Sequence, residues 1–487
     1  MKHIFIVSIL LLMFGLHSNA QVFEVSFASG LNQKDFSGNV LLYLSKENKS
    51  PKDIRVGFEV FPVYRLAVEN LKPNEDAIFN DTAVSHPVEL SNIERGEYYA
   101  QVVFDLNLGD FNIGNSSGNI YSEPIKVNLT KKFDEVFKIM ANKVIQTIDF
   151  TETEYIKELR IKSNLLSEFH AKDIFLNAAV NLPKEYHEHP EKNYPVVFSI
   201  TGFGGSYKKG LGKKRFLAQL GDQEAIVVLL DGKCSEGHSV YANSDVNGPW
   251  GDALVKELIP ALNEKYRTNH AILLHGHSSG GWSSLWLQVN YPTVFAGAWA
   301  SSPDQVDFRN YQNKNIYEID NMFYDGEDNL FADVTIAGRV PVTSAKDFYG
   351  TENVIYRGCQ LHSFDAVFGG YDKNQNQIRL VNMPSGEINK KALPLWRRYD
   401  LSVILRENWS SLKANLDGKI RISVGTNDNF YLNRSVELLE KEMYKLNANF
   451  EFKYYPGVHF RLYTPEYIRE GMKFLDRCYK NWLEKNE

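Results

Sequence analysis

From about Leu165 onward, short continuous apolar runs alternate with stretches of helical character, and this alternation constrains the fold more than any other feature. The runs read PVVFSI, AIVVLL, AILLHG, FAGAWA, KIRISVG and FEFKYYP, with amphipathic stretches such as 251–266 and 434–446 between them. Strands that are apolar throughout are buried on both faces, which is typical of a parallel sheet covered by helices. The sequence therefore predicts an α/β architecture with a mostly parallel central sheet for this part of the chain.

The first part of the chain has a different pattern. Between residues 22 and 130, segments such as VFEVSFA, NVLLYL and YYAQVVFDL are separated by Gly, Pro, Asn and Asp turns. This pattern predicts a small all-β sandwich of immunoglobulin-like type. A charged connection with some helical character at 131–164 is interpreted as a linker to the α/β domain at 165–487. A segment at about 303–413, rich in Asn, Asp, Tyr and Gly, interrupts the alternation and is interpreted as a long insertion, a candidate lid.

The N-terminus has the features of a secretory signal peptide. Lys2 and His3 precede an apolar run from Ile4 to Leu16, and Ser18-Asn19-Ala20 supplies small residues where a signal peptidase cleaves. The run is too short to span a membrane comfortably, and no later segment approaches a spanning length. We expect residues 1–20 to be removed and the mature protein to be secreted or periplasmic, without a stable membrane span.

Charge and cysteine content exclude several classes of function. A formal charge of −6 without a long Lys/Arg run gives no electrostatic footprint for nucleic acid. Cys234, Cys359 and Cys478 lie far apart and show no metal-binding spacing. No helical pair of histidines, carboxylate cluster or phosphate-binding glycine loop is found. We therefore expect neither a metal nor another cofactor, and the oligomeric state is left open.

The run AILLHGHSSGG places Gly276-His277-Ser278-Ser279-Gly280 after an apolar strand and before a helix. This is the context of the G-x-S-x-G nucleophile elbow of α/β-hydrolases, in which small residues on either side permit a sharp, strained turn. The sequence predicts Ser278 as a nucleophile, and the backbone N–H of Ser279 as one donor of an oxyanion hole. His277 is expected to point away from the reaction and to serve in packing.

A second oxyanion donor is expected from a loop after an earlier strand. Gly202-Phe203-Gly204-Gly205 follows the strand PVVFSI, and its glycines would let the backbone approach a substrate closely. The backbone amides of Phe203 and Gly204 are the candidate donors.

Only two histidines follow Ser278, and the chain order in α/β-hydrolases is serine, acid, histidine. His459 lies in a loop after the strand FEFKYYP, where the base belongs, whereas His362 lies within the insertion and is expected on the surface or in a lid. Asp428 follows the preceding strand, in KIRISVGTNDNFYL. We therefore expect Asp428 to orient His459 and to stabilise its imidazolium form.

These motifs resemble the putative esterase family, which includes esterase D, enterochelin esterases and mycolyl transferases. The matching segments are NGPWGDALVKELIPALNEKYRT, GHSSGGWSS, FAGAWASSP, residues 425–431 and Gly457-Val458-His459, in the order that the family has them. The resemblance covers residues 165–482 without much of the insertion. It implies hydrolysis of carboxylic esters by Ser278, Asp428 and His459. The oxyanion segment begins with Thr201-Gly202 instead of the family's His-Gly.

The predicted function is thus that of an exported serine esterase acting through an acyl-enzyme on a small-molecule or carbohydrate ester. Two alternatives remain open from the sequence: an acyltransferase with the same three residues, and a non-catalytic carbohydrate-binding protein on a hydrolase scaffold. Trp250, Trp282 and Trp286 lie near the presumed active-site layer, where they could stack on a substrate, although helical spacing favours core packing for the last two.

Overall fold

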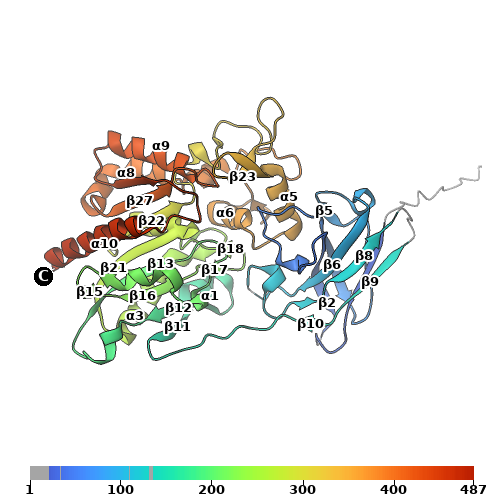
Figure 1. The fold of residues 1–487 in the computed structure, drawn as a ribbon, viewed down its shortest axis with the longest axis horizontal. Coiled ribbons are helices and arrows are strands. Elements are labelled where there is room, and N and C mark those ends of the chain that lie inside the picture. Colours follow the sequence, from blue (N-terminus) through green and yellow to red (C-terminus); the bar gives the residue numbers. More distant parts are fainter. Residues whose placement is uncertain (1–20, 33, 109, 131–134, 487) are drawn as a thin grey trace, which may run out of the picture. The chain divides into compact units, whose positions relative to one another are not determined.

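The computed structural model describes residues 21–486, except residues 33, 109 and 131–134 (Figure 1). The expected signal peptide, residues 1–20, lies outside these described residues. Within them, no helix is both long and apolar enough to cross a membrane. The chain divides into two compact units. The β unit comprises residues up to Pro51, Phe61–Phe104 and Ile120–Lys143, and the α/β unit comprises Lys52–Val60, Asp105–Asn119 and Val144 onward.

The β unit is built from two sheets, as the alternating apolar pattern predicts. One sheet has the order β4-β1-β9 and the other has the order β10-β7-β6-β2-β3-β5, with β8 paired to β6. Phe27, Phe36 and Phe104 pack edge to face between the sheets, with ring centroids 5.1–6.3 Å apart. The strands are β1 (Val22–Phe27), β2 (Phe36–Ser45), β3 (Val63–Leu71), β4 (Ala77–Phe79), β5 (Val84–His86), β6 (Gly96–Asp105), β7 (Ile120–Tyr121), β8 (Ile125–Leu129), β9 (Val136–Ala141) and β10 (Lys143–Val144).

The α/β unit is organised around an eight-stranded sheet of the order β11-β12-β16-β13-β21-β22-β27-β28. The six strands β16, β13, β21, β22, β27 and β28 run parallel to one another. At one edge, β12 pairs antiparallel with β16, and β11 pairs antiparallel with β12. This is the α/β-hydrolase sheet, and it confirms the predicted fold class. The strands are β11 (Ile156–Ser163), β12 (Ile174–Asn181), β13 (Tyr194–Ile200), β16 (Ile226–Leu230), β21 (Thr268–Ser278), β22 (Gly297–Pro303), β27 (Ile420–Gly425) and β28 (Glu451–Tyr455).

Helices cover both faces of this sheet. On one face, Val196 and Phe198 of β13 pack against the helical segment 250–265 and α4, and on the other, Val197 packs in the same cluster as Phe474 of α10. Alternate residues of one strand therefore enter two different cores, which explains why β13 is buried at every position and apolar at nearly all of them. The helices are α1 (Asn164–His170), α2 (Trp250–Ala253), a π-turn (Leu254–Leu258), α3 (Ile259–Lys265), α4 (Ser279–Asn290), α9 (Leu432–Lys445) and α10 (Pro465–Asn486).

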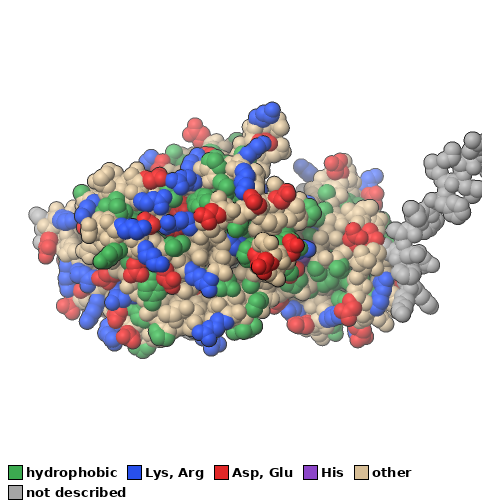
Figure 2. Space-filling view, turned by 90° about the horizontal axis from the view of Figure 1, so that it is seen from above, with side chains coloured by type: hydrophobic (Ala, Val, Ile, Leu, Met, Phe, Trp, Pro, Cys, Tyr) green, Lys and Arg blue, Asp and Glu red, His purple; other side chains and the backbone are tan. Residues whose placement is uncertain are grey.

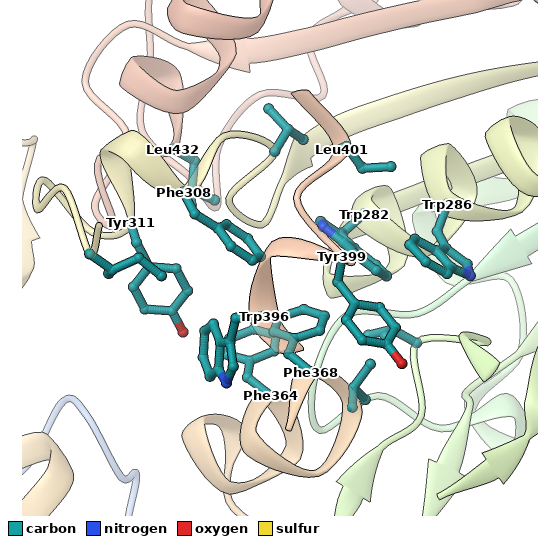
Figure 3. Close-up of a cluster of buried hydrophobic side chains, with 14 of the residues drawn as sticks. Trp282, Trp286, Phe308, Tyr311, Phe364, Phe368, Trp396, Tyr399, Leu401 and Leu432 are labelled. Atoms are coloured by element: carbon teal, nitrogen blue, oxygen red, sulfur yellow. The ribbon is translucent and has the colours of Figure 1, made fainter. Parts of the chain in front are cut away.

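The insertion at about 303–413 is more regular than its composition indicates. It contains α5 (Ala345–Ile355), α6 (Gln360–Phe368), α7 (Leu393–Arg397) and α8 (Leu401–Leu416), with two hairpins, β23 (Ala332–Ile336) with β24 (Val340–Ser344) and β25 (Gly370–Tyr371) with β26 (Gln377–Ile378). Its aromatic residues form a common core with α4 (Figure 3). Trp282 stacks on Trp286 at 5.1 Å, and Trp286 stacks on Tyr399 at 5.2 Å. These two tryptophans therefore pack in the core.

Three features differ from the sequence-based expectations. The expected linker contains strands, because β9 pairs with β1 and β11 forms the edge of the α/β sheet. Two segments from the first 130 residues, Lys52–Val60 and Asp105–Asn119, belong to the α/β unit. His362 is not on the surface; it lies in α6 and is 7% exposed. All three depend on contacts between distant parts of the chain, which local sequence patterns do not encode.

Candidate active site

Ser278 lies at the junction of β21 and α4 in a strained backbone conformation. Its φ is 60° and its ψ is −126°, a combination that non-glycine residues rarely adopt. The glycines around it are required by space: a Cβ on Gly276 would lie 2.0 Å from the Gly280 carbonyl oxygen, and one on Gly280 would lie 2.2 Å from that of Ile200. This is the strand-turn-helix geometry of a nucleophile elbow.

The glycine loop after β13 approaches the elbow directly. A Cβ on Gly202 would lie 3.2 Å from Ser278 Cβ, and the amide of Gly205 donates to the Gly202 carbonyl, closing a tight turn. Phe203 lies within this turn, and Gly204 adopts a φ of +76°. The loop expected to supply an oxyanion donor therefore lies beside Ser278, the expected nucleophile. Ser279, the other expected donor, is the first residue of α4.

Asp428 and His459 lie on the loops that follow the adjacent strands β27 and β28. His459 Nδ1 is 2.8 Å from Asp428 Oδ2, and the two side chains are 1% and 0% exposed. The backbone around them is also tied together, because the amide of His459 donates to Asn429 Oδ1 at 3.1 Å and the amide of Phe430 donates to Asp428 Oδ1 at 2.9 Å. The carboxylate is thereby held on the Nδ1 side of the ring.

A second buried carboxylate, Asp304, contacts Ser278, and sequence reasoning missed it. The Ser278 hydroxyl donates to Asp304 Oδ1 at 3.2 Å, and the Ser279 hydroxyl donates to Asp304 Oδ2 at 2.5 Å. Burial raises the pKa of Asp304 to about 6, against the opposing effects of Ser279 and His459. The available signal was its position, because Asp304 directly follows β22, and β22 pairs with β21 up to Ser278.

A family comparison connects this site to known proteins. The family described as "Putative esterase" matches residues 175–463, which is more than half of the chain and includes Ser278, Asp304, Asp428 and His459. The chain belongs to the putative esterase family. It is therefore an esterase, as the motifs predict.

Among curated proteins, none matches this esterase. Similar solved structures include a ferulic acid esterase, with 15% identity, a TM-score of 0.36, and coverage of 67% of this chain and 99% of the other. A fluorophosphonate-binding serine hydrolase of Staphylococcus aureus has 13% identity, a TM-score of 0.42 and coverage of 66% and 98%. An S-formylglutathione hydrolase from Agrobacterium tumefaciens has 15% identity, a TM-score of 0.37 and coverage of 68% and 95%.

Aromatic rings enclose His459 of the esterase. Phe430 and Phe460 pack edge to face against the imidazole, with centroids at 4.9 and 4.8 Å, and the ring of His277 lies at 4.6 Å. His277 therefore does not point away from the site as expected. Burial, and after it the charge of His459, hold the pKa of His277 well below its ordinary value, which favours the neutral ring. His277 Nδ1 lies 2.9 Å from Ser301 Oγ.

The two segments from the first 130 residues reach this site. Phe58, on the segment Lys52–Val60, packs on Phe430 at 5.8 Å and on Phe460 at 6.1 Å. Phe111, on the segment Asp105–Asn119, packs on Phe203 of the glycine loop after β13 at 5.4 Å. The rings beside His459 and beside this glycine loop therefore come partly from residues that the all-β pattern would assign to the first domain.

The insertion holds the second of these segments with a buried ion pair. Arg357 Nη2 lies 2.6 Å from Asp105 Oδ1, with side-chain exposures of 4% and 0%. Burial alone would raise the pKa of Asp105, but hydrogen bonds and charge from Arg357 outweigh it and the pKa is lowered. The guanidinium also donates to the Asp110 carbonyl at 2.7 Å.

One cluster outside the site has residues that could bind a cation. Ligand atoms of Glu352, Cys359 and His362 lie within 4.8 Å of one another and are buried. The Glu352 carboxylate already accepts the amides of Leu361 and His362 at 3.1 and 3.0 Å, so it caps the first turn of α6. This arrangement is accounted for as a helix cap.

Proposed function

We propose that the esterase hydrolyses carboxylic esters through an acyl-enzyme, with Ser278 as nucleophile, His459 as base and Asp428 as the residue that orients the base. The observation that carries this proposal is the buried 2.8 Å contact between Asp428 and His459, on loops adjacent to an elbow that carries Ser278 in a strained conformation. Nucleophile, base and orienting acid are the three groups that acyl transfer by a serine requires.

In the proposed reaction, Ser278 Oγ attacks the ester carbonyl carbon while its proton passes to His459 Nε2. His459 then gives the proton to the leaving alkoxide oxygen as the C–O bond breaks, and the acyl group remains on Ser278. Water repeats the sequence and releases the acid. The backbone N–H of Ser279, with that of Phe203 or Gly204, is proposed to stabilise the oxyanion.

In the structure the Ser278 hydroxyl donates to Asp304, and in the proposed reaction it turns to His459. Hydrogen bonds of this kind are often not aligned until substrate binds, so the present direction does not weigh against His459 as the base.

We also propose that the esterase is exported and acts outside the cytoplasm. The support is the order of Lys2, the apolar run from Ile4 to Leu16 and the small residues Ser18 to Ala20. N-terminal sequencing of the protein recovered from an expressing bacterium tests this. A chain beginning near Gln21 is expected, and an intact Met1 would contradict export by cleavage.

The catalytic proposal is tested with a panel of nitrophenyl esters, from acetyl to feruloyl, on the wild type and Ser278→Ala. Removal of the nucleophile is expected to lower kcat on the order of 10⁶-fold. A matched control is Ser283→Ala, because Ser283 lies one turn further along α4 and donates to a backbone carbonyl instead. If folded wild type hydrolyses no ester, the non-catalytic carbohydrate-binding alternative is favoured.

A further inference from the structure

Asp304 lies beside the reacting atom of the proposed nucleophile. The residue is 4% exposed, and its carboxylate accepts a hydrogen bond from the hydroxyl of Ser278, whose oxygen forms the acyl bond in the proposed reaction. Its backbone amide also donates to the Ser278 carbonyl at 3.3 Å, so its position relative to the elbow is held by the main chain as well.

The groups that act on this carboxylate come from the elbow and from the loops after β27 and β28, and the buried Tyr311 of the insertion has a pKa raised by burial and then by nearby carboxylates, Asp304 among them. The hydroxyls of Ser278 and Ser279 donate to its two oxygens, and His459 and Asp428 act on it through charge, with opposite signs. Among the described residues, no lysine or arginine forms an ion pair with Asp304. The two hydroxyls are therefore the hydrogen-bond donors that satisfy it.

The reaction removes one of these donors. When Ser278 turns its hydroxyl to His459, Asp304 Oδ1 loses its partner, whereas Oδ2 keeps Ser279. A buried carboxylate oxygen without a donor is costly, because it has lost water and gained nothing in exchange. A ligand that supplies a new donor at this point would remove that cost in the reactive complex.

We propose that Asp304 is a specificity residue that accepts a hydrogen bond from a hydroxyl group of the ester substrate, next to the scissile bond. The preferred substrates are then hydroxylated esters, either of hydroxy acids or of polyhydroxy alcohols such as sugars. This inference rests on the proposed acyl-enzyme function. It goes beyond that function by assigning a substrate class and a residue that selects it.

A hydroxyl suits this position better than a cationic group. His459 becomes an imidazolium ion during acylation, and it already acts electrostatically on Asp304. An ammonium group on Asp304 would repel that imidazolium, whereas a neutral hydroxyl satisfies the carboxylate oxygen and leaves its charge available to the imidazolium. Sites that hydrogen-bond a substrate hydroxyl discriminate strongly against analogues without it, because the buried polar partner is then left unpaired.

The test compares esters that differ only in the ability to donate. The first pair is methyl lactate and its O-methyl ether, and here the hydroxyl donor lies on the acyl side of the ester. The second pair is hydroxyethyl propanoate and methoxyethyl propanoate, and here the donor lies on the alcohol side. The ether keeps the inductive effect of the oxygen but has no O–H. For the wild type, kcat/KM is expected to be at least about tenfold higher for the hydroxyl member of one pair, and that pair identifies the source of the hydroxyl.

Asp304→Asn is expected to abolish this preference. Ser279 would still donate to the amide oxygen, which leaves the amide N–H directed at the substrate, and an N–H donates equally well to a hydroxyl and to an ether oxygen. The control is Asp365→Asn, since Asp365 is also buried with a pKa raised by burial to about 6 but accepts the amide of Leu380 instead. The control is expected to keep the wild-type ratio.

Labelling of Ser278 by a fluorophosphonate distinguishes a failure of the Asp304 assignment from a failure of the proposed function. If wild type labels and hydrolyses both members of each pair at equal rates, or if Asp304→Asn labels and keeps the preference, the assignment of Asp304 is overturned while the proposed function stands. If wild type neither labels nor hydrolyses any ester, the proposed function fails and the role of Asp304 fails with it.

Discussion

Asp428 Oδ2 lies 2.8 Å from His459 Nδ1, although the two residues are 31 positions apart in the chain. Their loops follow neighbouring parallel strands, β27 and β28, so the carboxyl edge of the sheet brings them together. The contact is buried, which strengthens the interaction between a carboxylate and an imidazolium ion relative to the same pair in water.

Asp428→Asn is expected to lower kcat by about 10⁴-fold with little change in fold, because an amide favours the wrong tautomer of His459. The measurement is kcat on a nitrophenyl ester. Asn427→Ala is the control, since the backbone of Asn427 is hydrogen-bonded to Gly457 and no side-chain hydrogen bond joins it to His459 among the described residues. A loss smaller than tenfold for Asp428→Asn would show that this carboxylate does not orient the base.

Asp304→Asn is expected to stabilise the α/β unit at high pH. The folded-state pKa of about 6 lies above the ordinary aspartate value of 3.8, so the folded state binds more protons between these values and stability falls as pH rises through them. The variant has no carboxylate at this position and does not lose this stability. Its free energy of unfolding is expected to exceed that of wild type by as much as about 3 kcal/mol at pH 8, and by almost nothing at pH 4. Urea unfolding followed by tryptophan fluorescence measures it.

That fluorescence reports on one unit only, because all 7 tryptophans lie at or beyond Trp250, in the α/β unit. The exposed Asp222, as Asp222→Asn, serves as the control and is expected to change nothing at either pH. A difference between Asp304→Asn and wild type that is the same at pH 4 and pH 8 would show that the buried carboxylate carries no such cost.

Gly276→Ala is expected to destabilise the α/β unit by about 3 kcal/mol or more, because the new Cβ would lie 2.0 Å from a backbone oxygen that cannot move without opening the elbow. Gly326→Ala is the matched control, since nothing lies within 4 Å of a Cβ there, and its effect should stay within about 0.5 kcal/mol. Equal urea midpoints for the two variants would mean that the tight turn is not required.

Phe58→Ala is expected to lower kcat/KM by about tenfold, because the ring supports Phe430 and Phe460, which enclose His459, and each aromatic pair contributes about 0.5–1.5 kcal/mol. Phe137→Ala removes a comparable ring that stacks on Phe23 in the β unit, and it should leave esterase activity unchanged. If both variants keep wild-type kcat/KM, the segment Lys52–Val60 has no part in the site.

The sequence predicted the parts of the structure that local rules control. Apolar runs identified β13, β16, β21, β22, β27 and β28. β16 is buried and apolar at every position, as burial on both faces requires. β28 was identified although it lies at the edge of the sheet, is only partly buried and carries Glu451 and Lys453. The glycines around Ser278 identified the elbow, since only small residues fit between the crossing backbones. Chain order then reduced the choice of base and acid to His459 and Asp428, which the structure brings together.

The sequence did not predict features that depend on which distant segments become neighbours. Asp304 has no motif of its own, and its position beside Ser278 follows from the pairing of β22 with β21. Phe58 lies 372 positions from Phe430 by residue number, in a region whose pattern indicates an all-β domain. His362 was expected on the surface or in a lid because it lies within the irregular insertion, yet it is buried in α6 of that insertion.

The most direct test of the central claim is reaction of the wild-type esterase with a fluorophosphonate, followed by peptide mass spectrometry. The account predicts one phosphonyl group per chain, on Ser278 alone, and labelling that slows strongly in His459→Ala because the base is absent. An adduct on another serine, or no adduct on a folded protein that hydrolyses esters, would contradict the assignment of Ser278 as the nucleophile.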